Sequence, residues 1–144
     1  MIPAWIGCRD FHDTRSKASV KENGKEILFI NKDGKEIAKY RVDGCIINSS
    51  DGKKSDFLFL VITDKRAFFI ELKGNKIESA LKQIRLSIDM LKPHLPGFKI
   101  EARIISQHGK VPRAYETDYL KLKKYLRQLG GDLVIKTLRL EEAI

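Results

Sequence analysis

Residues 56–73 read DFLFLVITDKRAFFIELK and contain the strongest secondary-structure signal of the chain. It contains two apolar runs, 56–62 and 67–72, which are joined by four polar residues. In both runs the apolar residues follow one another instead of alternating with polar ones. This pattern is typical of central strands that are covered on both faces. The stretch therefore predicts two neighbouring antiparallel strands at the centre of a buried sheet.

The flanking sequence predicts a mixed α/β domain around these two strands. Upstream, residues 27–30 and 36–42 enclose the turn sequence NKDG and predict a β-hairpin. Downstream, apolar residues recur at helical spacing until two prolines end the pattern. The further predicted elements are a strand at 45–47, a helix at 76–92, a strand at 98–106, a helix at 117–129 and a strand at 133–138. We expect a single domain over 1–144 with its core at about 27–138.

The first 25 residues are the least informative part of the chain. They are polar, and a short helix within 14–22 is the one element that they suggest before the Asn23-Gly24 turn signal. No apolar run approaches the length of a membrane helix, and residues 1–8 do not resemble a signal peptide. We therefore expect no membrane association and a cytoplasmic location.

The chain contains two cysteines, Cys8 and Cys45, and neither belongs to a CxxC pair. A protein of the cytosol keeps its thiols reduced, so we expect two small semi-buried residues and no disulfide.

Three charged residues interrupt the apolar block: Asp56 at its start, and Glu71 and Lys73 at its end. An even-numbered turn centred on Asp64-Lys65 places residue 56 opposite 73 and residue 58 opposite 71. Side chains alternate along a strand and cross-strand partners share a face, so the three charged groups then converge. An odd-numbered turn sends Asp56 to the other face unless a bulge corrects it.

A buried charge needs a partner or a metal ion. Two neighbouring carboxylates repel each other, and a divalent cation, which prefers oxygen ligands, relieves this repulsion. Such an ion can also activate water for attack on a phosphate, beside a lysine that stabilises the charge that develops. The alternative is a structural ion pair between Glu71 and Lys73 at a strand end.

Residues 43–106 resemble the core of the PD-(D/E)xK nuclease superfamily, the fold of many restriction enzymes, Holliday-junction resolvases and RecB-like nuclease domains. In that family an acidic residue opens the second core strand and (D/E)xK closes the third, as Asp56 and Glu71-Leu72-Lys73 do here. A helix and a fourth strand follow, and they match residues 77–91 and 100–106. The resemblance implies a restriction-endonuclease-like central mixed β-sheet flanked by helices.

The resemblance also implies an activity, namely a Mg²⁺- or Mn²⁺-dependent endonuclease that hydrolyses phosphodiester bonds of DNA. Its metal ligands are Asp56, Glu71 and Leu72, and its catalytic residues include Lys73. Several relatives place a glutamine near the metal on the following helix, where this chain has Gln83, although Ser87 stands where a tyrosine would follow. The alternative for Gln83 is a solvated side chain on the helix surface.

The chain departs from the family pattern in two ways. Ser55 precedes Asp56, where the family name has proline. Many members also carry a glutamate on a helix ahead of the first core strand, and the local candidates, Glu22 and Glu26, lie in no convincing helix. Completion of the metal site by Asp43 is an open alternative.

The net charge of +9 favours a polyanionic partner. Lys53 and Lys54 directly precede the strand that starts at Asp56, and Lys121 and Lys124 lie on the last predicted helix. We expect these four residues to contact nucleic acid, namely DNA. A homodimer is an open alternative, as are two other functions: a nuclease-like module that binds nucleic acid without cleaving it, and a basic interaction protein.

Overall fold

The computed structural model describes residues 3–48, 55–72, 76–108 and 110–144. Two α-helices are accompanied by three short 3₁₀ helices and nine strands within these ranges. The helices are α1 (Ile77–Leu91), α2 (Glu116–Gln128), η1 (Pro3–Cys8), η2 (Lys92–His94) and η3 (Arg113–Tyr115). The strands are β1 (Arg9–Asp13), β2 (Lys17–Glu22), β3 (Lys25–Ile30), β4 (Ile37–Arg41), β5 (Phe57–Val61), β6 (Arg66–Leu72), β7 (Lys99–Ser106), β8 (Leu133–Thr137) and β9 (Arg139–Ala143).

The strands form a six-stranded mixed sheet and a three-stranded sheet. The large sheet has the order β1-β4-β5-β6-β7-β8, and the small sheet has the order β2-β3-β9. The first four strands of the large sheet pair antiparallel, whereas β6, β7 and β8 are mutually parallel. The predicted mixed α/β class is therefore confirmed.

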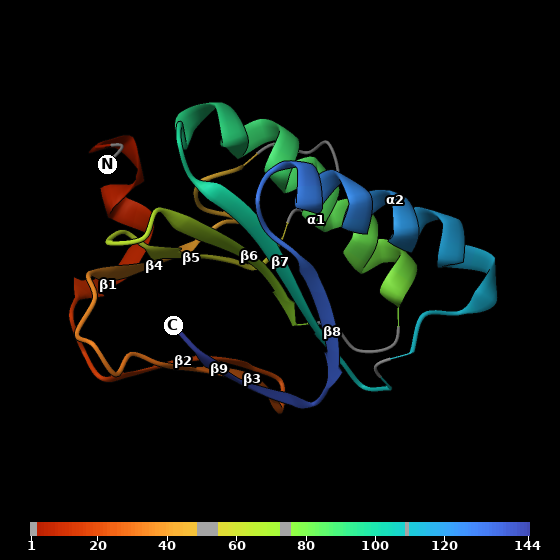
Figure 1. Ribbon diagram of the computed structural model, residues 1–144, viewed down its shortest axis with the longest axis horizontal. Helices are drawn as coiled ribbons and strands as arrows, with labels where there is room; N and C mark the ends of the chain where they lie inside the picture. Colours follow the sequence, from red (N-terminus) through yellow and green to blue (C-terminus); the bar gives the residue numbers. More distant parts are fainter. Residues whose placement is uncertain (1–2, 49–54, 73–75, 109) are drawn as a thin grey trace.

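The large sheet lies between two different layers (Figure 1). Helices α1 and α2 cover one face, and the small sheet covers the other. Two hydrophobic clusters fill the two interfaces, which explains why β5 and β6 are apolar on both faces. The expectation of helices as flanking elements holds for one face of the sheet only.

The predicted hairpin over residues 27–42 is wrong. Strands β3 and β4 lie in different sheets, so the NKDG sequence turns the chain from one sheet into the other. The Asn31 side-chain amide donates to the main-chain oxygens of Arg15 and Lys35, and its oxygen accepts the N–H of Lys35. These bonds stabilise the turn that connects the two sheets. The residue composition of this turn is the same as that of a hairpin turn, so the sequence alone cannot distinguish them.

Two other local predictions are corrected. Residues 17–22 form strand β2 rather than a helix, because Ala18 and Val20 alternate into the core and the Asn23-Gly24 turn pairs this strand with β3. No strand forms at 45–47, because residues 44–46 are a turn and a single bridge joins Asp43 to Ile47 across it. Outside residues 27–138, Trp5 is buried and β9 lies near the other end of the described residues.

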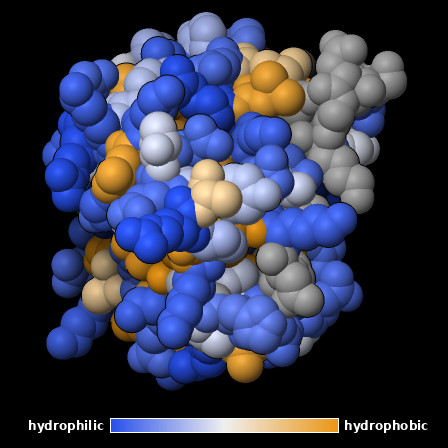
Figure 2. All heavy atoms as spheres, turned by 90° about the vertical axis from the view of Figure 1, so that its right-hand side faces the viewer, coloured by the Kyte–Doolittle hydropathy of each residue, from blue (hydrophilic) through white to orange (hydrophobic). Residues whose placement is uncertain are grey.

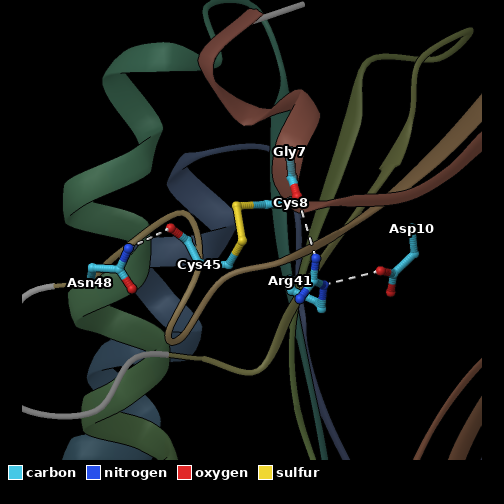
Figure 3. Close-up of a disulfide and its surroundings, with 6 residues drawn as sticks. All are labelled: Gly7, Cys8, Asp10, Arg41, Cys45 and Asn48. Carbon is cyan, nitrogen blue, oxygen red and sulfur yellow. Dashed lines mark hydrogen bonds and ion pairs between the residues drawn. A yellow bond between two sulfur atoms is a disulfide. The ribbon is translucent and has the colours of Figure 1, made fainter.

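The expectation of reduced cysteines is wrong as well. Cys8 at the end of η1 and Cys45 in the turn after β4 form a disulfide. Figure 3 shows this bond beside Arg41, whose guanidinium donates to the oxygen of Gly7 and to Asp10. The N-terminal segment is thus attached to the β4–β5 connection by a covalent bond and by polar contacts.

Removal of this disulfide is expected to lower the free energy of unfolding. The bond joins residues 37 positions apart, so it restricts the unfolded chain, and a bridge of this kind stabilises by about 2–4 kcal/mol. Denaturant unfolding of the Cys8→Ser/Cys45→Ser double variant should show this loss, and the parent in a dithiol reductant should match it. A double variant as stable as the oxidised parent would contradict the pairing.

A buried ion-pair cluster holds the small sheet against β7. Arg103 bonds Glu142 of β9 at 2.7 Å and Glu101 at 3.1 Å. Burial lowers the pKa of Arg103, but its bonds to these carboxylates outweigh burial and leave that pKa raised. Arg103 therefore stays charged, and its ion pair with Glu142 links the last strand to the large sheet.

Candidate functional site

The register of β5 and β6 differs by two residues from the predicted one. Phe57 pairs with Ile70, and Val61 pairs with Arg66 across a four-residue connection. The turn is even-numbered, as expected, but it is centred one residue earlier. Because the shift is even, the alternation of faces within both strands is unchanged.

The chain is irregular at Asp56. Its main-chain N–H donates to the oxygen of Ile70 at 3.0 Å, although Phe57 is already the register partner of Ile70. Two residues thus oppose one, which is the arrangement of a β-bulge, and a bulge re-aims the side chains beside it. One carboxylate oxygen of Asp56 accepts the N–H of Leu72 at 2.9 Å. The Asp56 carboxylate therefore lies at the end of β6, one residue beyond Glu71.

Glu71 is the buried acid of the site, with 1% of its surface exposed. It alternates with Ala67 and Phe69, which belong to the hydrophobic cluster beneath α1 and α2, so its side chain extends toward the helices. A carboxylate at such a position needs a compensating donor or cation. Lys73, the third predicted member, lies outside the described residues.

Gln83 is buried rather than solvated. Only 8% of it is exposed, and its Oε1 atom has no hydrogen-bond partner among the described residues. It lies on α1 one turn before Ser87, whose hydroxyl accepts the main-chain N–H of Ser55 at 2.7 Å. Ser55 directly precedes Asp56 in the chain. The face of α1 that carries Ser87 therefore contacts the segment that leads into Asp56.

A pocket of about 230 Å³ opens beside Asp56. Its lining includes Glu22 at the end of β2 and Asp43 in the turn after β4. Glu26, the other candidate for the family's additional glutamate, accepts a hydrogen bond from Ser19 that lowers its pKa, and it pairs with Arg139. Of the two glutamates, the one near Asp56 is Glu22, which lies on a strand where the family has a helix.

Four residues at or near this end of β6 carry oxygen atoms of the kind that a hard cation prefers as ligands. Asp56 and Glu71 supply carboxylates, Leu72 can supply only its main-chain oxygen, and Gln83 has a buried amide oxygen. Within 3–48, 55–72, 76–108 and 110–144, no three His, Cys, Asp or Glu side chains are grouped as a metal site would require. A bound Mg²⁺ would therefore depend on two carboxylates together with main-chain, amide or water oxygens.

The predicted nucleic-acid contacts divide into two groups. Lys121 and Lys124 are exposed on α2, whereas their neighbour Lys123 donates to Asp132 and to the main chain of Leu133. Lys53 and Lys54 lie outside the described residues.

Figure 2 shows the end of the molecule where α1 and α2 begin. The visible surface at this end is mainly hydrophilic, with small separate hydrophobic patches.

Comparisons of the chain with protein-family models, with curated proteins and with solved structures found no match. Among the described residues, no helix is long and apolar enough to cross a membrane.

Proposed function

We propose that this protein is a metal-dependent nuclease that hydrolyses phosphodiester bonds of DNA. The observation that carries the proposal is the bond from the Leu72 N–H to the Asp56 carboxylate, which brings that group to the strand end occupied by the buried Glu71. Carboxylate oxygens are the ligands that a divalent cation prefers. Asp56 and Glu71 would supply one such ligand each from neighbouring strands.

The order of the elements supports the resemblance to PD-(D/E)xK nucleases. An acidic residue opens β5, Glu71-Leu72 ends β6, α1 follows, and β7 then pairs parallel to β6. The family assignment is part of the proposal. The small sheet that covers the second face of the large sheet is a feature of this chain beyond the shared core.

The proposed roles follow from the chemistry of each group. Asp56, Glu71 and the main-chain oxygen of Leu72 would hold Mg²⁺ or Mn²⁺, with the Gln83 amide at the border of the site. When bound, such an ion neutralises negative charge on the phosphate and makes a water more acidic. Lys73 would supply an ammonium group that stabilises the charge of the transition state. The bond from Leu72 orients Asp56 before substrate binds.

Binding of the substrate is assigned to basic residues outside this cluster. Replacing Lys121 and Lys124 with alanine is expected to weaken DNA binding and to reduce its salt dependence, because each lost phosphate contact lowers the slope of log K against log salt by about one. Fluorescence anisotropy at several salt concentrations measures that slope. The matched control is Lys17→Ala with Lys32→Ala, which removes the same charge from exposed positions away from the helices. Equal slopes for the two double variants would contradict the assignment.

The test of the proposed function is cleavage of labelled duplex, branched and single-stranded DNA, and of RNA, with magnesium, manganese or a chelator. We expect the protein to cleave at least one DNA substrate, and we expect the chelator to abolish this cleavage. Binding without cleavage in either metal would instead favour the inactive nucleic-acid-binding module. Neither binding nor cleavage would favour the basic interaction protein.

A further inference from the structure

We infer that Ser87 is a positioning residue for Asp56, and that its hydroxyl sets the affinity of the site for its metal. This inference rests on the proposed function, because it assigns the Asp56 carboxylate to a divalent cation.

The contact joins two fully buried residues from different layers. Ser87 on α1 and Ser55 before β5 are both 0% exposed, and the Ser55 N–H donates to the Ser87 hydroxyl at 2.7 Å. On its other side, the main-chain oxygen of Ser55 accepts the N–H of Asp43 at 3.1 Å. The backbone that leads into Asp56 is thus held by the helix and by the turn after β4.

The bulge explains why this position needs such support. The regular pairing of β5 with β6 begins at Phe57. Asp56 itself keeps single main-chain bonds on its two sides, from its N–H to the Ile70 oxygen and from the Val42 N–H to its own oxygen, both at 3.0 Å. Loss of the hydroxyl leaves the Ser55 N–H buried without its acceptor, which is costly. The segment would then rotate to recover a partner and would carry the Asp56 carboxylate with it.

The position of Ser87 on α1 supports the same role. It lies beside the buried apolar residues Ile84 and Ile88, where a hydroxyl would be unfavourable without a partner. It also follows Gln83 by one helical turn, so the bond to Ser55 fixes the strand end relative to the helix that carries the buried amide. A group that orients a metal ligand typically contributes 10- to 100-fold to metal affinity or activity.

The test compares Ser87→Ala and Ser87→Thr with Ile84→Val, a variant that removes one buried methylene from the same helix without touching Ser55. Calorimetric titration with Mg²⁺ alone gives the dissociation constant, and unfolding gives the stability of each variant. We expect about a tenfold or greater rise in the constant for Ser87→Ala, recovery of most of the affinity in Ser87→Thr, and no change in Ile84→Val. Amide hydrogen exchange should accelerate in Ser87→Ala at Ser55 and Asp56, while the amides of β7 stay protected.

Alanine is the best helix former, so Ser87→Ala is expected to fold. An unchanged Mg²⁺ dissociation constant in Ser87→Ala would overturn the inference. The inference would also be overturned if Ile84→Val lost Mg²⁺ affinity and stability in the same proportion as Ser87→Ala does. A parent protein that binds no Mg²⁺ and cleaves no substrate would instead refute the proposed function. Binding and cleavage by the parent are therefore measured first, before the variants are compared.

Discussion

Replacing Lys73 with alanine is expected to slow cleavage by about 10²- to 10³-fold, the usual cost of removing one preorganised electrostatic group. In the sequence, Lys73 directly follows β6, two residues beyond Glu71, and we propose that it acts on the scissile phosphate. Its charge would stabilise the transition state more than the bound substrate, so turnover should fall much more than affinity. Basic residues elsewhere should keep DNA binding almost unchanged.

Single-turnover cleavage and anisotropy binding, measured on the same preparation, separate the two effects of Lys73→Ala. Lys76→Ala is the matched control, because Lys76 is exposed three residues further along the chain and its loss removes the same charge. If Lys73→Ala cuts as fast as the parent while the parent requires metal, the lysine is an ion-pair partner and has no catalytic role.

The Glu71→Gln variant is expected to lose cleavage by on the order of 10³-fold or more, since charge stabilisation by a bound cation is worth several kcal/mol. Glutamine has nearly the same size as glutamate, so the packing at this buried position should be retained. The substitution removes the negative charge that holds the ion, and binding of both metal and substrate phosphate should weaken.

Cleavage rates at several Mg²⁺ concentrations test this expectation. Glu116→Gln is the control, because it removes the same charge from an exposed position at the start of α2. A Glu71→Gln variant that cleaves at the rate of the parent would show that the buried carboxylate serves only the fold.

The central part of the fold could be predicted because its signals are local and continuous. The two apolar runs became β5 and β6, covered on both faces, and the helix expected over 76–92 is α1 at Ile77–Leu91. The stripe through Ile84 and Ile88 is buried as expected. Such patterns record which side of an element meets the core, and this information is present in a short window of sequence.

The small sheet could not be predicted because it depends on distant partners. Strand β3 pairs parallel with β9, and Glu26 of β3 bonds Arg139, 113 residues further along the chain. The turn residues between β3 and β4 fit a hairpin equally well, so the presence of β9 decides which sheet receives β3. The disulfide could not be predicted for the same reason. Cys8 and Cys45 are distant in the sequence, and they meet because η1 lies against the turn after β4.

The candidate site was predicted in its residues more than in its geometry. Alternation along a strand assumes a regular ladder, and the bulge at Asp56 breaks that assumption. The role inferred for Ser87 was not predicted, since a serine at the edge of an apolar stripe resembles an ordinary surface residue. A polar residue in the same helical column as Gln83 is the signal that could have indicated it.

The most direct measurement is calorimetric titration of Mg²⁺ into the parent protein, into Asp56→Asn and into Glu71→Gln. Each variant removes the charge of one of the two proposed carboxylate ligands and keeps the shape of the side chain. We expect saturable binding to the parent, with stabilisation against thermal unfolding by mass action, and loss of that binding in both variants. Absence of binding to the parent, or equal binding to all three proteins, would contradict it.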